Sequence, residues 1–263
     1  MGEVFKLDQD LKIKEKETVN GGKFYKVLIN GEGTINGDVE CKKFLVPGIC
    51  KMMGNLKCKV IETKGRALFD KNVQAEKSKF GGIVAVKGKV DVDDLVFNGR
   101  IAVEGDVTGR DINILGMASI TANLKAECLF VSGAAYIEKN IDTEIFSLSG
   151  GLVNKGTINA NNINMTLGAK SNMNNISGKE IKIKKPDNTG GFLSSFLKKF
   201  IKNKVQLEAN IIDGEDIHIE NTIANLVRGN NVTIGEGCII NTVEYRNTIN
   251  FEKNGKCKSQ KKI

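Results

Sequence analysis

The chain contains no tryptophan, and only one histidine and two prolines occur among its 263 residues. A single histidine excludes sites built from two or three histidines, such as the zinc centre of carbonic-anhydrase-like enzymes. So little proline, beside 29 glycines without a triplet period, excludes collagen and a proline-rich linker protein. The remaining composition, 40% hydrophobic and 27% charged, is typical of a folded protein.

Targeting segments are also missing from the pattern of the sequence. No run of about 18 apolar residues predicts a transmembrane helix, and residues 1–14 lack the apolar stretch of a secretory signal. The six cysteines form no CxxC pair, so we expect free thiols that serve as small core residues in a reducing cytoplasm, without a metal site. They are Cys41, Cys50, Cys58, Cys128, Cys238 and Cys257.

The strongest feature that is present is an internal repeat marked by glycine. Eight glycines follow one another at a constant spacing of 17 residues, which chance does not produce when glycine is about one residue in nine. Apolar or small residues recur at fixed positions after each glycine, as three i, i+2 pairs per cycle. The glycines are Gly31, Gly48, Gly65, Gly82, Gly99, Gly116, Gly133 and Gly150.

These i, i+2 pairs are the signature of short strands with one buried face. Three such strands per 17 residues, with glycines at corners that require positive φ, make a triangular coil. Coils that stack at about 4.8 Å complete both a sheet and a core. We therefore predict an all-β fold, a parallel β-helix (solenoid) with 17-residue triangular coils, interrupted by one short amphipathic helix.

The pattern divides the chain into five segments. Residues 1–23 are a lead-in or cap, and residues 24–184 form the main β-helix. Residues 185–204 form a linker and the amphipathic helix, after a clear break at Pro186 to Gly191. Residues 205–252 resume the β-helix, and residues 253–263 form a basic disordered tail. The resumed columns are Ile217, Ile234 and Phe251; Val232 and Ile249; Ile223 and Ile240; Leu226 and Val243.

The formal charge of +8 is concentrated in two short segments. Residues 185–204 carry a net +4 and residues 253–263 a net +5, which leaves the remaining chain close to neutral. The predicted helix in the first segment has one apolar stripe. This stripe either packs on the β-helix or lies on an anionic membrane surface. Its apolar residues and the lysines on its opposite side are Phe192, Leu193, Phe196, Leu197, Phe200, Ile201, Lys198, Lys199 and Lys202.

Catalytic patterns are weak, and we predict no catalytic, metal or cofactor site. No phosphate-binding G-x-x-x-x-G-K-[ST] loop occurs, and His218 is predicted to face solvent because it stands between Ile217 and Ile219. Acidic clusters at 91–94 and 213–216 could serve glycoside hydrolysis, but no tryptophan supplies a sugar platform. The alternatives are a β-helix enzyme, hexapeptide-transferase-like or polysaccharide-acting, and, ranked third, a nucleic-acid binder that uses the basic segments.

Coil sequences such as Ile35-Asn36-Gly37-Asp38-Val39 and Val103-Glu104-Gly105-Asp106-Val107 resemble those of the bactofilins, bacterial polymer-forming cytoskeletal proteins. The resemblance covers residues 24–184, and residues 211–245 are similar to the longer subgroup of Gram-positive bacteria. It implies a right-handed coil, nucleotide-independent end-to-end polymerisation, membrane-associated scaffolding in the cytoplasm and no enzyme activity.

An uncapped terminal coil would expose strand N–H and C=O groups to a second copy of the chain. We therefore expect a homopolymer joined through its first and last coils, with an anionic membrane surface, the inner face of the cell membrane, as a second partner. The residues expected at the contacts are Phe24, Val27, Ile29, Ile35, Val39, Phe44, Val46, Ile240, Val243, Ile249 and Phe251.

Overall fold

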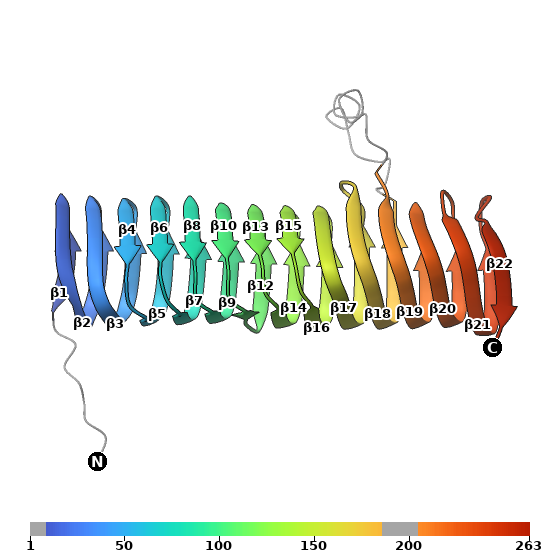
Figure 1. The fold of residues 1–263 in the computed structure, drawn as a ribbon, viewed down its shortest axis with the longest axis horizontal. Coiled ribbons are helices and arrows are strands. Elements are labelled where there is room, and N and C mark those ends of the chain that lie inside the picture. Colours follow the sequence, from blue (N-terminus) through green and yellow to red (C-terminus); the bar gives the residue numbers. More distant parts are fainter. Residues whose placement is uncertain (1–8, 186–204) are drawn as a thin grey trace, which may run out of the picture. The chain divides into compact units, whose positions relative to one another are not determined.

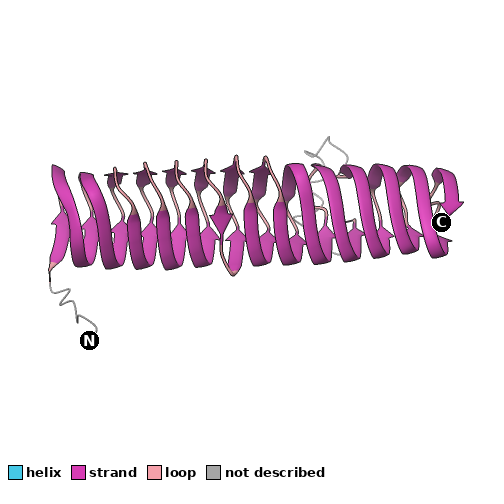
Figure 2. Ribbon diagram, turned by 60° about the horizontal axis from the view of Figure 1, so that its bottom comes forward, coloured by secondary structure: helices cyan, strands magenta, loops and turns pink. Residues whose placement is uncertain are grey.

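The protein is described here by a computed structural model that covers residues 9–185 and 205–263. These residues form 22 strands, all joined in parallel pairs, and contain no helix (Figures 1 and 2). They make a parallel β-solenoid of about 14 turns with coils of about 17 residues, which confirms the predicted fold class. The predicted helix at residues 192–202 lies outside the described residues.

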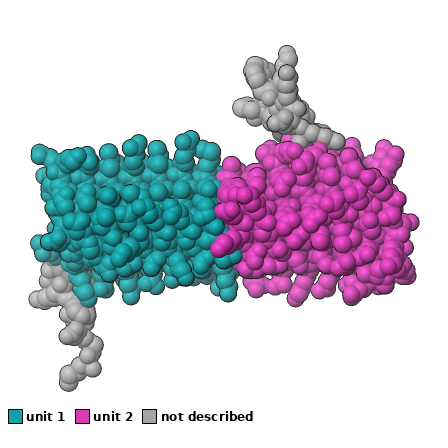
Figure 3. Space-filling view, viewed as in Figure 1, with its two compact units in different colours: residues 1–127 teal, residues 128–263 magenta. Residues whose placement is uncertain are grey.

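The chain divides into two compact units, residues 1–127 and 128–263 (Figure 3). Strand β14 (Leu124–Val131) contributes residues to both. The other strands of unit 1 are β1 (Asp10–Ile13), β2 (Lys16–Ile29), β3 (Glu32–Val46), β4 (Ile49–Met52), β5 (Leu56–Thr63), β6 (Arg66–Phe69), β7 (Val73–Phe80), β8 (Ile83–Val86), β9 (Val90–Phe97), β10 (Arg100–Val103), β11 (Val107–Thr108), β12 (Asp111–Ile114) and β13 (Met117–Ile120).

The core of unit 1 is a set of stacked columns. From β3 to β13 each paired residue lies 17 positions from its partner, for example Cys41 opposite Cys58 and Ile101 opposite Ala118. Every inward residue therefore packs on the equivalent residue of the next coil, as the alternation of buried and exposed residues along the strands shows. Buried rings add aromatic contacts, with centroids 5.9–6.1 Å apart, between successive members of the series Phe44, Phe69, Phe80 and Phe97.

We expected the repeat glycines to be required by positive φ. They are instead required by the close approach of the backbones of neighbouring coils. A Cβ on Gly48 would lie 2.2 Å from the carbonyl oxygen of Gly31, and one on Gly65 would lie 1.9 Å from that of Gly48. Among the eight repeat glycines, only Gly82 has a positive φ, at 68°. The corner backbones thus stack directly on one another and leave no room for a side chain.

A second corner, seven residues after each repeat glycine, carries a ladder of polar side chains. The Asn55 N–H donates to Asp38 Oδ1 (2.7 Å), the Asn72 N–H to Asn55 Oδ1 (3.3 Å), and the Lys89 N–H to Asn72 Oδ1 (2.9 Å). Each side chain accepts the backbone N–H at the same position one coil later, so it satisfies an amide at the turn. This position is not among the apolar columns predicted from the repeat.

Unit 2 has a less regular register. Its further strands are β15 (Ala134–Ile137), β16 (Ile141–Leu148), β17 (Gly151–Thr166), β18 (Ser171–Lys184), β19 (Leu207–Ile219), β20 (Thr222–Ile234), β21 (Ile239–Phe251) and β22 (Cys257–Lys262). Strands β18 and β19 pair directly, with Ile181 opposite Ile217. Residues 186–204 therefore separate two neighbouring coils without replacing one.

The predicted columns of the resumed block are partly wrong. Ile217 lies opposite Val232, and Ile234 lies opposite Ile219. The offset falls to 15 here because only two residues connect β19 to β20, one of them Asn221 with a φ of 46°. Two further predicted pairs shift by one residue: Ile223 lies opposite Ile239 rather than Ile240, and Leu226 opposite Thr242 rather than Val243. The pairs Val232 with Ile249 and Ile234 with Phe251 are confirmed.

Both outer boundaries also differ from the prediction. Residues 1–23 were expected to precede the solenoid, yet Asp10 in β1 already pairs with Lys26 in β2. Residues 253–263 were expected to be disordered, yet β22 pairs with β21 and the Ile263 N–H donates to the Tyr245 carbonyl (3.0 Å). The strand was missed because its lysines hide the apolar period, and only Cys257, opposite Ile240, continues a buried column.

Candidate functional site

The first candidate surface is the outer edge of unit 1. Strand β1 pairs with β2 over Lys26–Ile29, and the Tyr25 N–H donates to the Gln9 carbonyl (3.0 Å). Nothing among the described residues pairs with the other backbone edge of β1, or with that of β2 over Lys16–Asn20. The edge therefore offers strand N–H and C=O groups to another strand.

The second candidate surface is the outer edge of unit 2. Strand β22 covers β21 only from Ile240 to Tyr245. Within the described part of the chain, no strand pairs with the outer edge of β21 over Asn247–Phe251 or with that of β22. Phe251 is 45% exposed there, which is large for an aromatic side chain. This edge is thus a second open template for a parallel strand.

The structure places few of the residues expected at the contacts on these edges. Phe24 and Ile249 are half-buried and Phe251 is exposed. The others are fully buried within their own unit: Val27, Ile29, Ile35, Val39, Phe44, Val46, Ile240 and Val243. The half-buried edge residues Leu11 and Val19 were not predicted, because β1 and the start of β2 follow an offset of 16 rather than 17.

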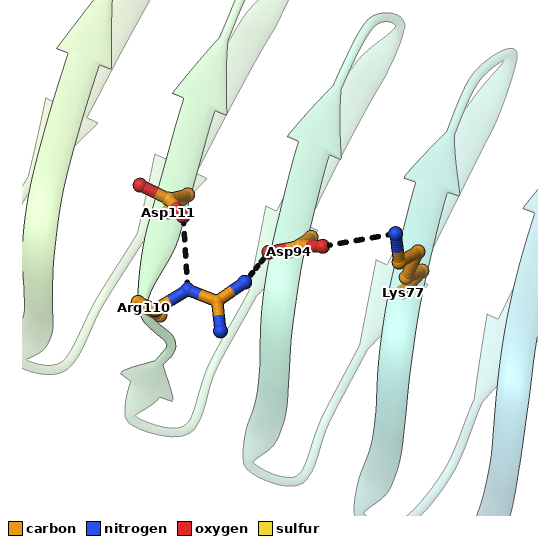
Figure 4. A network of polar contacts seen from close by, with 4 residues as sticks. All are labelled: Lys77, Asp94, Arg110 and Asp111. Carbon is orange, nitrogen blue, oxygen red and sulfur yellow. Dashed lines mark hydrogen bonds and ion pairs between the residues drawn. The ribbon is translucent and has the colours of Figure 1, made fainter.

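In the two acidic clusters, four of the six carboxylates form ion pairs or accept hydrogen bonds, namely Asp91, Asp94, Asp213 and Asp216. In unit 1, Asp94 lies between Lys77 (Nζ to Oδ2, 3.4 Å) and Arg110, and the Arg110 Nε is 3.0 Å from Asp111 Oδ2 (Figure 4). Partial burial raises the pKa of Asp94, but hydrogen bonds from Lys77 and Arg110 outweigh it and hold the pKa below the usual 3.8. A carboxylate in this state is a poor general acid.

Acidic side chains of unit 2 also lie close to positively charged or titratable groups. The guanidinium of Arg228 lies 2.7 Å from Glu244 Oε2 and 3.5 Å from Asp213 Oδ2. His218 lies between two buried isoleucines on the outward side of β19, and its Nε2 is 3.5 Å from Glu252 Oε2. Asp94, Asp213 and His218, three residues that an enzymatic interpretation would use, therefore each have a charged neighbour.

The cysteines are free thiols, and four of the six are buried. Cys41 and Cys58 are neighbours in register, and their mutual hydrogen bond, followed by burial, raises the pKa of the Cys58 thiol. Burial raises the pKa of Cys50 to about 12. Such thiols are protonated and unreactive at neutral pH. In the described ranges, no three His, Cys, Asp or Glu side chains gather where they could hold a metal ion, and no helix could cross a membrane.

Comparison with known proteins gives one distant relative. YhbF of Bacillus subtilis (strain 168), whose name marks it as uncharacterized, is 38% identical over 64 residues. The match covers 24% of this chain and 27% of that protein, so the chain spans about a quarter of its relative's length. No family model and no solved structure matches. The chain is therefore a β-solenoid protein distantly related to YhbF.

Proposed function

We propose that the protein is a non-enzymatic cytoskeletal scaffold that assembles end to end into filaments without nucleotide, as the resemblance to bactofilins implies. The observation that carries the proposal is the pair of open strand edges, one at β1–β2 and one at β21–β22. The two edges are different surfaces, so a contact between them is heterologous and does not close on itself. Repetition of such a contact produces a filament.

The charges of the edges favour contact between unlike ends. Strand β22 carries three lysines and no acid, whereas residues 10–17 carry three acids and three lysines. Two β22 edges would repel each other, while β22 and the β1–β2 edge can form ion pairs. Head-to-tail joining of parallel strands also keeps the sheet parallel across the junction.

A proline in the edge strand tests the proposal. The Ile263 N–H points toward β21, and successive amides of a strand alternate in direction, so the Gln260 N–H points outward. Gln260→Pro should therefore abolish filaments in negative-stain microscopy and shift sedimentation to the monomer, while the melting temperature changes little. The control Gln260→Thr keeps the N–H and should polymerise. Monomers alone from the wild-type protein over a wide concentration range would reject the proposal.

We further propose that the scaffold is peripheral on the cytoplasmic face of the cell membrane, with further copies of itself as its partner. The support from the sequence is the basic segment 185–204, and the stripe within it lies outside the described residues. Flotation with liposomes, comparing wild type with Phe196→Asp/Phe200→Asp, tests the contribution of that stripe.

A further inference from the structure

One outward column of unit 1 alternates between aliphatic residues and arginines. Strands β4, β6, β8, β10 and β13 lie side by side in this order (Figure 1). Their first residues are in register, and all five are exposed: Ile49, Arg66, Ile83, Arg100 and Met117. We call this row the arginine–aliphatic column. At about 4.8 Å per strand, it is about 19 Å long.

The apolar members of the column are unusually accessible. Ile49, Ile83 and Met117 are 45%, 48% and 50% exposed, and they make up three of the five exposed large apolar side chains described in unit 1. The second outward position of the same strands adds Leu68 and Ala85, both half-buried, to the face. Exposed apolar groups concentrated on one face mark a surface that contacts something other than water.

The two arginines of this face differ from Arg110, the third arginine of unit 1. Arg110 is held by Asp94 and Asp111. By contrast, neither Arg66 nor Arg100 has a carboxylate or hydrogen-bond partner among the described residues. Lys51 stands at the second outward position of β4, and neither outward position of the five strands holds an acid. The face thus combines three uncompensated positive charges with half-exposed apolar side chains.

The backbone under this face is regular. All four pairings between these strands keep the same 17-residue offset, without a bulge. Each strand has four residues, so the face is a short sheet of five strands.

We propose that this face of unit 1 binds the surface of an anionic lipid bilayer. The guanidinium groups would pair with lipid phosphates, to which Arg binds in a bidentate manner. Ile49, Ile83 and Met117 would reach the boundary between headgroups and acyl chains, as in interfacial amphipathic elements. Charge complementarity selects an anionic surface. The aliphatic side chains between the cations favour lipid over nucleic acid, which requires a denser row of cations.

The inference gives the proposed membrane association a surface within the described solenoid, and it does not require end-to-end assembly. The test is flotation of the full-length protein with phosphatidylcholine vesicles that contain 30% phosphatidylglycerol, and with vesicles of phosphatidylcholine alone. Wild type should float only with the anionic vesicles. Arg66→Glu/Arg100→Glu should lower the apparent affinity at least about tenfold, because each cation near the surface contributes several-fold.

A matched control separates the contribution of this face to vesicle binding from the contribution of net charge. Lys57→Glu/Lys125→Glu makes the same charge change at exposed lysines of β5 and β14, outside the five strands of the face, and should stay within about threefold of wild type. Ile49→Thr/Ile83→Thr keeps charge and β-branching, and should weaken binding about three- to tenfold. Circular dichroism must show folded protein, and microscopy should show unchanged filaments, so loss of binding and loss of polymerisation are scored apart.

The competing outcomes are distinct. An equal loss of vesicle affinity in the arginine double variant and the lysine double variant would mean that net charge alone drives adsorption, which overturns the proposal. Unchanged binding in the arginine pair would assign the contact to another segment, and unchanged binding in the isoleucine pair would exclude apolar insertion; either result overturns it as well.

Discussion

At the scale of single residues, the solenoid is limited by space at its glycine corners. At seven of the eight repeat glycines an added Cβ would lie 1.9–2.4 Å from a backbone carbonyl oxygen of the preceding coil, so even one methyl group must displace backbone rather than a side chain. Elsewhere a glycine can be less critical. At Gly33 the nearest atom to an added Cβ is the Ile13 Cδ1, 2.8 Å away, at the flexible end of a side chain.

Gly65→Ala should therefore destabilise the protein strongly, by about 2–4 kcal/mol, since its Cβ would meet the Gly48 carbonyl oxygen at 1.9 Å. Gly33→Ala serves as the matched comparison, and a cost of about 1 kcal/mol or less is expected. Urea denaturation followed by circular dichroism measures both. A loss of stability in Gly65→Ala as small as that in Gly33→Ala would show that the corners can spread to accept a side chain.

At the scale of the element, the three sides of the coil were predictable from the sequence because their i, i+2 pairs repeat with little variation. The polar corner was not, since Asp38, Asn55 and Asn72 share a side-chain oxygen that accepts a backbone N–H and are not apolar. The arginine–aliphatic column escaped for the same reason. Because Ile and Arg alternate in it, the column has no constant hydrophobicity that would mark it as an apolar period. Only the strand register places these residues in one row.

The polar ladder makes its own prediction. Asn72→Ala removes the acceptor of the Lys89 N–H and should cost about 1 kcal/mol, because a backbone amide at the corner then has water as its partner. Asn72→Asp keeps an oxygen acceptor at the same place and should cost less. Thermal melting of the two variants side by side provides the comparison; an alanine variant as stable as wild type would show that the ladder is dispensable.

At the scale of the whole molecule, the candidate assembly surfaces could be predicted only in outline. An open end follows from any uncapped solenoid, but which residues form it depends on where the coils begin and stop. Asp10 and Cys257 extend the solenoid beyond its predicted limits at 24 and 252. Most residues that we expected at the contacts therefore lie in the interior, among them Phe44 and Val243.

The direct pairing of β18 with β19 carries a prediction at this scale. Replacing residues 186–204 with a four-residue Gly/Ser linker should leave the solenoid folded, because Ile183 and Ile219 are already opposite each other and four residues are enough to connect β17 to β18. An unchanged circular dichroism spectrum and a melting temperature within a few degrees are expected. Loss of the β-sheet signal would show that the replaced segment is needed for folding.

The constant register of unit 1 also bears on how such a chain can change in length. Loss or duplication of one complete coil returns every inward residue to an equivalent column, so tandem recombination within the coding sequence can shorten or lengthen the core without disturbing it. The outward face obeys a stricter rule. Because Ile and Arg alternate between neighbouring coils, removal of a single coil would set Arg beside Arg or Ile beside Ile. Only changes of two coils at a time preserve the alternation, which gives the surface a repeat unit twice as long as that of the core.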